Sequence, residues 1–204
     1  MTETDASNVA DVALRRQRAA LAGHDGDEAA ARSLLSDPAP GVRATALGAL
    51  ARMGHLQEAD VLAGLADAGP EVRRRACEEA VGLAAIDLGV LLRDPDPTVV
   101  EAAAWALGER GDAAGAPAVT ALAAVATAHE DPLCREAAVA ALGAIGDAAG
   151  LDAILAATAD KPAVRRRAVL ALAPFEGPEV DAALQRALED RDWQVRQAAE
   201  DLLA

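Results

Sequence analysis

The stretch Asp37-Pro-Ala-Pro-Gly-Val-Arg43 places an acidic residue and prolines ahead of a valine, an arginine and an alanine-rich segment. Variants of this phrase recur five more times along the chain. Their apolar anchor residues, counting the first copy, are Val42, Val72, Val99, Cys134, Val164 and Val195. Successive anchors lie 30, 27, 35, 30 and 31 residues apart. A repeat of about 30 residues predicts stacked helical hairpins, in which each hairpin buries its apolar face against its neighbours.

Each repeat is expected to contain two helices, A and B, because apolar residues recur at three- and four-residue steps. Proline suits the first position of a B helix, where its missing N–H removes no hydrogen bond. Gly54, Gly111 and Gly146 follow B helices, as a left-handed terminating residue would. A lead helix is predicted over residues 8–22. The predicted A and B helices are 27–36 with 40–53, 56–66 with 70–83, 86–92 with 97–110, 114–128 with 132–145, 148–158 with 162–173, and 178–189 with 192–203.

Several phrases carry a resemblance to a known family. Val-Arg-x-x-Ala, the segment Ala-Trp-Ala-Leu-Gly-Glu-Arg-Gly-Asp (104–112) and the segment Ala-Ala-Leu-Gly-Ala-Ile-Gly-Asp (140–147) resemble HEAT-like repeats. They are similar in particular to the short class first described in phycobilisome lyases, a family with many bacterial proteins. The resemblance covers about residues 27–204. It implies an all-α fold, a right-handed alpha-alpha superhelix (α-solenoid) of about six HEAT-like hairpins plus an N-terminal helix. We expect residues 9–204 to form a single solenoid domain after a flexible N-terminus of residues 1–8.

The composition restricts the partners and the location. The formal net charge is −14, from 33 acidic and 19 basic residues, which opposes nonspecific binding to nucleic acid or to an anionic membrane. No apolar run reaches the ~18–20 residues of a membrane span. The polar start lacks the basic-then-apolar order of a signal peptide, so a cytoplasmic location is expected. Cys77 and Cys134 are interpreted as small buried side chains, because two cysteines do not make a disulfide framework.

Five arginines follow the anchors, at positions 43, 73, 135, 165 and 196. In HEAT-like proteins this arginine usually pairs with an aspartate of the preceding loop or of the neighbouring repeat. We therefore predict that these arginines form a structural ladder and are not phosphate ligands. Repeat three departs from the pattern, because Val100 stands where the arginine is expected, and repeat four has Cys134 as its anchor.

The resemblance also implies a binding face. In the family the B helices line a concave inner wall, where positions flanking the anchor point outward. In this chain the candidate residues are Glu71, Arg74, Arg75, Glu101, Trp105, Leu133, Glu136, Arg166, Arg167, Leu170, Trp193 and Gln197. Trp and Arg are the residue types most enriched at interface hot spots. The hypothesis is an acidic or partly extended peptide, anchored by Trp105 with arginine pairs on either side. The alternative is that Trp105 fills a gap between repeats, Trp193 covers the last one and the arginine pairs are solvated.

Residue patterns typical of catalysis are missing from the sequence. The three histidines fall in separate repeats, and none of the three serines has a nucleophile-elbow context. We therefore predict no enzyme activity, cofactor or metal site. The predicted function is a non-catalytic protein–protein interaction scaffold or adaptor that binds another protein or an acidic peptide. Two alternatives come from the resemblance: a HEAT-like DNA glycosylase or nucleic-acid-binding protein, against which the net charge argues, and a tetrapyrrole lyase or chaperone-like factor. The sequence leaves the partner's identity and the oligomeric state open.

Overall fold

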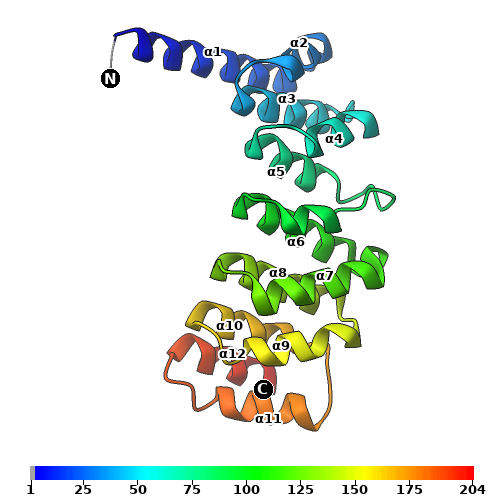
Figure 1. The fold of residues 1–204 in the computed structure, drawn as a ribbon, viewed down its shortest axis with the longest axis vertical. Helices are drawn as coiled ribbons and strands as arrows, with labels where there is room; N and C mark the ends of the chain where they lie inside the picture. The colour runs from blue at the N-terminus through cyan, green and yellow to red at the C-terminus, as the bar shows by residue number, and fades with distance from the viewer. Residues whose placement is uncertain (1–2) are drawn as a thin grey trace. The chain divides into compact units, whose positions relative to one another are not determined.

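The computed structural model describes residues 3–204, with side chains from residue 9 onward, and every regular element in that range is a helix. The chain divides into two compact units, residues 1–86 (unit 1) and residues 87–204 (unit 2). Figure 1 shows that helical hairpins follow one another within each unit. All six anchor residues of the repeat phrase are buried. The predicted all-α fold of helical hairpins is confirmed.

Unit 1 is built around one central B helix. Its elements are α1 (Glu3–Asp25), α2 (Glu28–Ser33), the 3₁₀ turn η1 (Leu34–Ser36), α3 (Pro40–Met53), α4 (Glu58–Leu65) and α5 (Pro70–Glu79). Helix α3 packs against both α1 and α5, and α4 packs against α5. The apolar core between α1 and α3 contains Ala19, Leu34, Val42 and Ala46. Helix α1 therefore packs on α3 in the way that one B helix packs on the next, and it covers the first hairpin.

The N-terminal boundary differs in detail from the prediction. Helix α1 includes residues 3–8 of the segment expected to be flexible, and residues 1–2 lie outside the described residues. The division into a flexible segment 1–8 and one domain 9–204 stays a prediction.

Unit 2 contains a continuous row of B helices. Its elements are η2 (Gly89–Arg93), α6 (Pro97–Arg110), η3 (Gly111–Ala114), α7 (Gly115–Ala128), α8 (Pro132–Ile145), η4 (Ala148–Gly150), α9 (Leu151–Ala157), α10 (Pro162–Ala171), α11 (Pro178–Ala187) and α12 (Trp193–Leu203). Helix α8 packs between α6 and α10, and α10 packs on α12. The A helices α7, α9 and α11 pack against the B helices α8, α10 and α12 of their own repeats. The outer side of this row of four B helices is the surface on which most of the predicted site residues lie.

Small residues let neighbouring B helices approach closely. A methyl group placed on Gly143 of α8 would lie 2.6 Å from the Cβ and 2.7 Å from the Cα of Ala171 in α10. A methyl group on Gly108 of α6 would lie 3.0 Å from the Cα of Ala141 in α8. Side chains larger than hydrogen are therefore excluded at these contacts without a shift of the backbone. This close packing explains why an alanine- and glycine-rich chain can form a well-packed array.

The A helix of repeat three was predicted wrongly. An α-helix was expected over 86–92, but the structure has the 3₁₀ turn η2, with backbone hydrogen bonds from Leu91 to Leu88 and from Asp94 to Leu91. The Asp87 carboxylate accepts the backbone N–H of Gly89 at 2.8 Å, which forms a local turn in place of the first helical turn. The 27-residue interval leaves too little chain for a full A helix. The boundary between the two units falls immediately before this turn.

The predicted helix ends are largely confirmed. Gly54 and Gly146 end α3 and α8 with φ values of +73° and +71°, in the left-handed region that favours glycine. Asp131 caps α8 by accepting the N–H of Leu133. For α6 the capping residue is Asp96, whereas Asp94 accepts the N–H of Asp96 and braces the loop.

Candidate functional site

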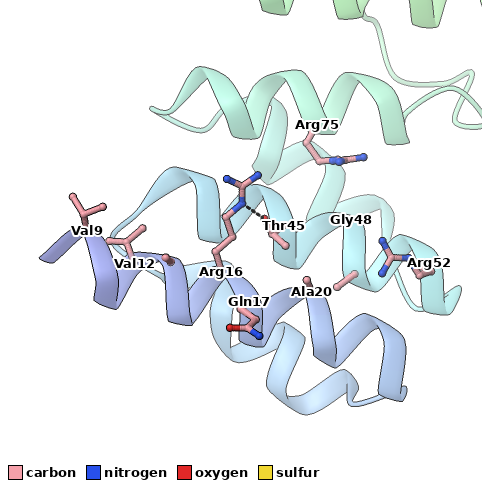
Figure 2. Close-up of a pocket in the computed structure, with 11 residues that line it drawn as sticks. Val9, Val12, Arg16, Gln17, Ala20, Thr45, Gly48, Arg52 and Arg75 are labelled. Atoms are coloured by element: carbon pink, nitrogen blue, oxygen red, sulfur yellow. Dashed lines mark hydrogen bonds between the residues drawn. The ribbon is translucent and has the colours of Figure 1, made fainter. Parts of the chain in front are cut away.

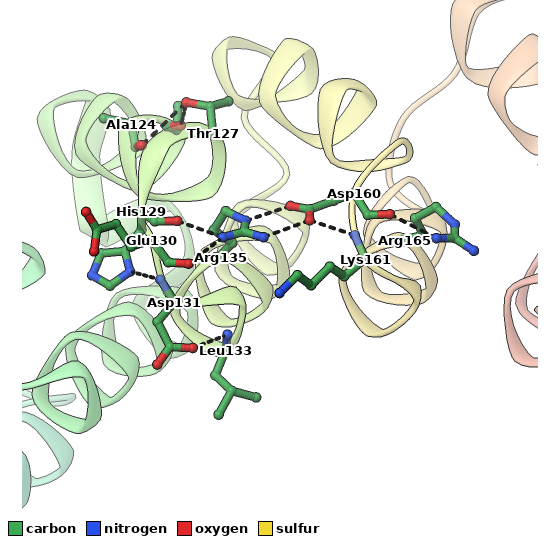
Figure 3. Close-up of polar contacts among 11 residues, drawn as sticks. Ala124, Thr127, His129, Glu130, Asp131, Leu133, Arg135, Asp160, Lys161 and Arg165 are labelled. Atoms are coloured by element: carbon green, nitrogen blue, oxygen red, sulfur yellow. Dashed lines mark hydrogen bonds and ion pairs between the residues drawn. The ribbon is translucent and has the colours of Figure 1, made fainter.

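Three of the anchor-following arginines, Arg43, Arg135 and Arg165, bind the loop of the next repeat. Arg135 in α8 donates two hydrogen bonds to the Asp160 carboxylate, from Nε at 2.6 Å and from Nη2 at 2.7 Å. Its remaining nitrogen donates to the backbone carbonyls of His129 and Glu130 in its own loop (Figure 3). Arg43 with Asp67 and Arg165 with Asp190 repeat this bidentate geometry. Each of these three arginines therefore joins two adjacent repeats, as the predicted ladder requires. Arg196, in the last repeat, donates to the carbonyl of Asp190 in its own loop.

The ladder also determines the charge state of its carboxylates. Hydrogen bonds from Arg43, Arg135 and Arg165 lower the pKa of their partners Asp67, Asp160 and Asp190 below the ordinary value. Burial opposes this shift but does not reverse it. Because these arginines are already bound by carboxylates, they are not available to bind a phosphate. They hold the B helices in register and leave the outer surface of those helices free.

Repeat three lacks a ladder arginine of its own, and its surroundings are acidic. Val100 is buried where the arginine would stand, so no ladder arginine precedes Asp131. Burial, with the nearby carboxylates of Asp131 and Glu136, raises the pKa of Glu101. Burial also raises the pKa of the Cys134 thiol to about 12. Cys134 is therefore an unreactive core residue, and the outer part of α6 near Glu101 is negatively charged.

Both tryptophans lie on the outer surface of the B helices of unit 2. Trp105 in α6 is 48% exposed and Trp193 at the start of α12 is 64% exposed. Leu133, at the start of α8, is 56% exposed. Neither indole is fully buried between repeats, and these exposures are also compatible with Trp105 filling part of a gap and Trp193 covering the last repeat. The largest apolar side chains of the predicted site therefore face solvent in the described structure.

A hollow of about 230 Å³ lies over α10 and α12. Arg166, Leu170, Trp193, Gln197 and Asp201 contribute to its lining. The Gln197 amide donates to Asp201 at 2.8 Å. Within residues 9–204 the exposed Arg166 guanidinium makes no ion pair. The structure thus brings four predicted site residues, Arg166, Leu170, Trp193 and Gln197, together around one depression that Asp201 also lines.

The other predicted arginines have acidic partners. Arg167 pairs with Glu136 on the neighbouring helix α8 at 3.4 Å. In unit 1, Arg74 pairs with Glu78 at 2.7 Å, and Arg75 lies 3.0 Å from Glu78 and 3.4 Å from Glu79. These ion pairs reduce the positive charge that the sequence predicted for the face. Glu71 is exposed on α5 near the start of the same helix.

Unit 1 holds a larger hollow that the repeat pattern did not predict. It has a volume of about 640 Å³ and lies over α1, α3 and α5 (Figure 2). Three arginines line it, namely Arg16, Arg52 and Arg75, together with Gln17, Thr45 and small apolar residues. The sequence does hold one signal: Arg15-Arg16 repeats the doublets Arg73-Arg74 and Arg165-Arg166. Arg15 also binds Asp37, as a ladder arginine does.

Metal-ion clusters and membrane-spanning helices are both absent from the described part of the chain. Among residues with described side chains, no three or more His, Cys, Asp or Glu residues are grouped so that they could hold a metal ion. None of the described helices is both long enough and apolar enough to span a membrane.

Comparisons with known proteins agree with this architecture. Residues 119–204 match the HEAT repeats family. The chain is similar to an engineered protein of known crystal structure, with 21% identity over 87% of this chain and 95% of that one and a TM-score of 0.59. It is also similar to a designed armadillo repeat protein in complex with the peptide (KR)4, with 17% identity, 93% and 97% coverage and a TM-score of 0.57. Human deoxyhypusine hydroxylase in complex with glycerol gives 22% identity, 93% and 78% coverage and a TM-score of 0.48. No curated protein matches the sequence significantly.

The row of hairpins and the two structural likenesses above a TM-score of 0.5 define an α-solenoid of helical repeats. Within that class, residues 119–204 are HEAT-like repeats, as the family match over that segment shows. Folds of this class commonly mediate protein binding through their extended helical surfaces. The narrower resemblance to the phycobilisome-lyase class and the cytoplasmic location stay predictions.

Proposed function

We propose that this protein is a non-catalytic interaction scaffold or adaptor that binds a partner protein or peptide on the outer surface of its B helices. The observation that carries this proposal is the placement of both tryptophans. In a chain with only 1% aromatic residues, both indoles are exposed on B helices of unit 2, with Leu133 exposed on α8. Exposed Trp side chains are the commonest hot spots of protein interfaces.

The arginine ladder supports the same proposal. The ladder uses one recurring geometry at the loops to hold the B helices in register, so the outer positions of these helices do not have to repeat that contact. Those outer positions carry a mixture of Trp, Leu, Arg and Glu, which suits recognition better than solvation alone. The designed armadillo repeat protein that shares this fold is in complex with the basic peptide (KR)4, so a solenoid of this kind can hold a peptide.

The surface over α10 and α12 supports binding of an acidic peptide, whereas the surface near Trp105 does not. Over α10 and α12, Arg166 is free of ion pairs within the described residues and lies in the same hollow as Trp193. That part of the surface suits an acidic side chain beside an apolar one. Near Trp105 the neighbouring carboxylates of Glu101 and Glu136 oppose an acidic ligand. We therefore propose that Trp105 contacts an apolar portion of the partner and that acidic groups bind elsewhere.

Affinity purification from the native cell tests this function. We expect specific partners to be retained by the wild-type protein and to be reduced at least about tenfold by Trp105→Ala combined with Trp193→Ala, since interface Trp truncations commonly cost about 2 kcal/mol or more. Leu62→Ala is the matched control, because Leu62 is 49% exposed but lies on the A helix α4. If the double variant recovers the partners as well as the wild type does and its circular dichroism is unchanged, the proposed function is contradicted.

A further inference from the structure

The hollow of unit 1 has an unusual charge for this chain. Arg16 comes from α1, Arg52 from α3 and Arg75 from α5, so each of the three helices that pack side by side in unit 1 supplies one guanidinium. No carboxylate among the described residues lines the hollow. A protein with a net charge of −14 thus concentrates positive charge in one concave place. Such a concentration attracts anions and steers them toward the site.

Two of the three arginines lack an acidic partner among the described residues. The Nε atom of Arg16 donates to the hydroxyl of Thr45 at 3.3 Å. This is the hydrogen bond that the Arg16 side chain makes among the described residues. Arg52 is exposed and makes no ion pair with any described residue. Arg75 is shared with Glu78 and Glu79 on its own helix. The guanidinium groups of Arg16 and Arg52 can therefore bind carboxylates in the bidentate geometry that the ladder already uses.

Small apolar residues form part of the lining, which we call the floor of the hollow. Val12 and Ala20 of α1 and Ala49 of α3 line it, beside the bare backbone of Gly48. The Nε atom of Arg75 would lie 3.3 Å from a methyl group on Gly48, so the absence of a side chain there makes room for the arginine. In Figure 2, Arg16 and Arg52 reach the hollow at different ends, with Ala20 and Gly48 between them. An apolar side chain fits on this floor, flanked by charged groups.

We propose that the unit 1 hollow binds an acidic segment of a partner protein, with carboxylates at Arg16 and Arg52 and an apolar side chain on the floor between them. This inference rests on the proposed function only in taking the partner to be a protein. The separation of Arg16 and Arg52 along the hollow favours several acidic groups on an extended chain over one compact anion. The apolar floor favours the same ligand, because an inorganic anion gains nothing from apolar contact.

Fluorescence anisotropy with labelled synthetic peptides tests this inference on the full-length protein. The probe is (Glu-Glu-Leu)4, and (Gln-Gln-Leu)4 and (Lys-Lys-Leu)4 are the peptide controls. We expect only the acidic peptide to bind, and we expect Arg16→Gln with Arg52→Gln to weaken it about tenfold or more. The matched variant is Arg18→Gln with Arg93→Gln, which removes the same charge from exposed positions outside the hollow. We expect this variant to change the affinity less than about threefold, through long-range charge alone.

Three results would overturn the inference. The first is equal weakening by the two double variants, which would show nonspecific attraction. The second is binding of (Lys-Lys-Leu)4 with equal or greater affinity. The third is full displacement of the acidic peptide by inorganic phosphate, where sodium chloride of the same ionic strength does not displace it, since that result would identify a site for a single anion. Circular dichroism of each variant confirms that the fold is intact, because all four arginines are exposed or line an open surface.

The same variants separate this inference from the proposed function. One outcome is that the Trp105 and Trp193 changes abolish partner binding while the Arg16 and Arg52 changes leave it intact. That result would support the scaffold function and contradict the proposed site in unit 1. If partners are lost with both sets, both proposals are supported.

Discussion

Gly143→Ala is expected to destabilise the protein by about 2–3 kcal/mol, which is the cost of overpacking a tight helix contact. The added methyl group would lie 2.6 Å from the Ala171 Cβ, 2.7 Å from its Cα and 3.0 Å from its carbonyl oxygen. Two of these atoms belong to the backbone of α10, so a rotamer change cannot relieve the clash. For a chain of this size the change corresponds to a fall of roughly 5–10 °C in the unfolding midpoint measured by circular dichroism.

Gly41→Ala is the matched control for this substitution. Gly41 lies in the first turn of α3, and a methyl group there meets no atom within 4 Å. Alanine is also the better helix former, so the variant should be neutral or stabilised by up to about 1 kcal/mol. An unfolding midpoint for Gly143→Ala equal to that of Gly41→Ala would contradict the close approach of α8 and α10.

Arg165→Met is expected to cost about 2–3 kcal/mol at neutral pH, because it breaks charge-assisted hydrogen bonds at a buried site. Arg165 is only 6% exposed, and its Nε and Nη2 donate to the Asp190 carboxylate at 2.8 and 2.7 Å. A third donor binds the carbonyl of Asp160 at 2.9 Å. Methionine keeps much of the apolar stem, so the loss reports on the hydrogen bonds. Arg166→Met, at the exposed neighbouring position, should stay within about 0.5 kcal/mol of the wild type.

The pH dependence of this difference provides a second check. Arg165 lowers the pKa of Asp190 in the folded protein, so folding is stabilised when the pH is above the ordinary pKa of an aspartate, about 3.9. That stabilisation is lost as the pH falls through the lower, folded-state pKa. The stability difference between wild type and Arg165→Met should therefore be full at pH 7 and shrink below pH ~4. A difference that stays constant down to the acid-unfolding range would show that the ion pair contributes nothing.

The sequence predicted the repeat architecture well because its signals are local and periodic. The spacing of the anchors predicts that Val42 and Val164 lie in the core and that Gly54 and Gly146 lie at helix ends, and both predictions are confirmed. The failed prediction, the A helix of repeat three, was an extrapolation of that period across a shortened interval. In that interval the local turn at Asp87 determines the backbone conformation, so the repeat period does not predict it.

The candidate site was less predictable because charge pairing depends on tertiary contacts. The pairing of Arg75 with Glu79 follows from their four-residue spacing on one helix. The pairing of Arg167 with Glu136 joins residues 31 positions apart and depends on how α8 and α10 are aligned. Arg16 and Arg52 were not predicted because neither follows an anchor of the six repeat phrases. Arg16 and Arg52 line the same hollow because α1 packs on α3 as a B helix would, and the repeat phrases do not encode that packing.

Site-specific photo-crosslinking in the native cell tests most directly whether the B helices carry the binding surface. A photoreactive benzoylphenylalanine is introduced as Leu133→benzoylphenylalanine on α8 or as Ala124→benzoylphenylalanine on the A helix α7; both native residues are exposed. We expect a discrete crosslinked partner from position 133 and none from position 124. A partner crosslinked from position 124 alone would contradict this prediction.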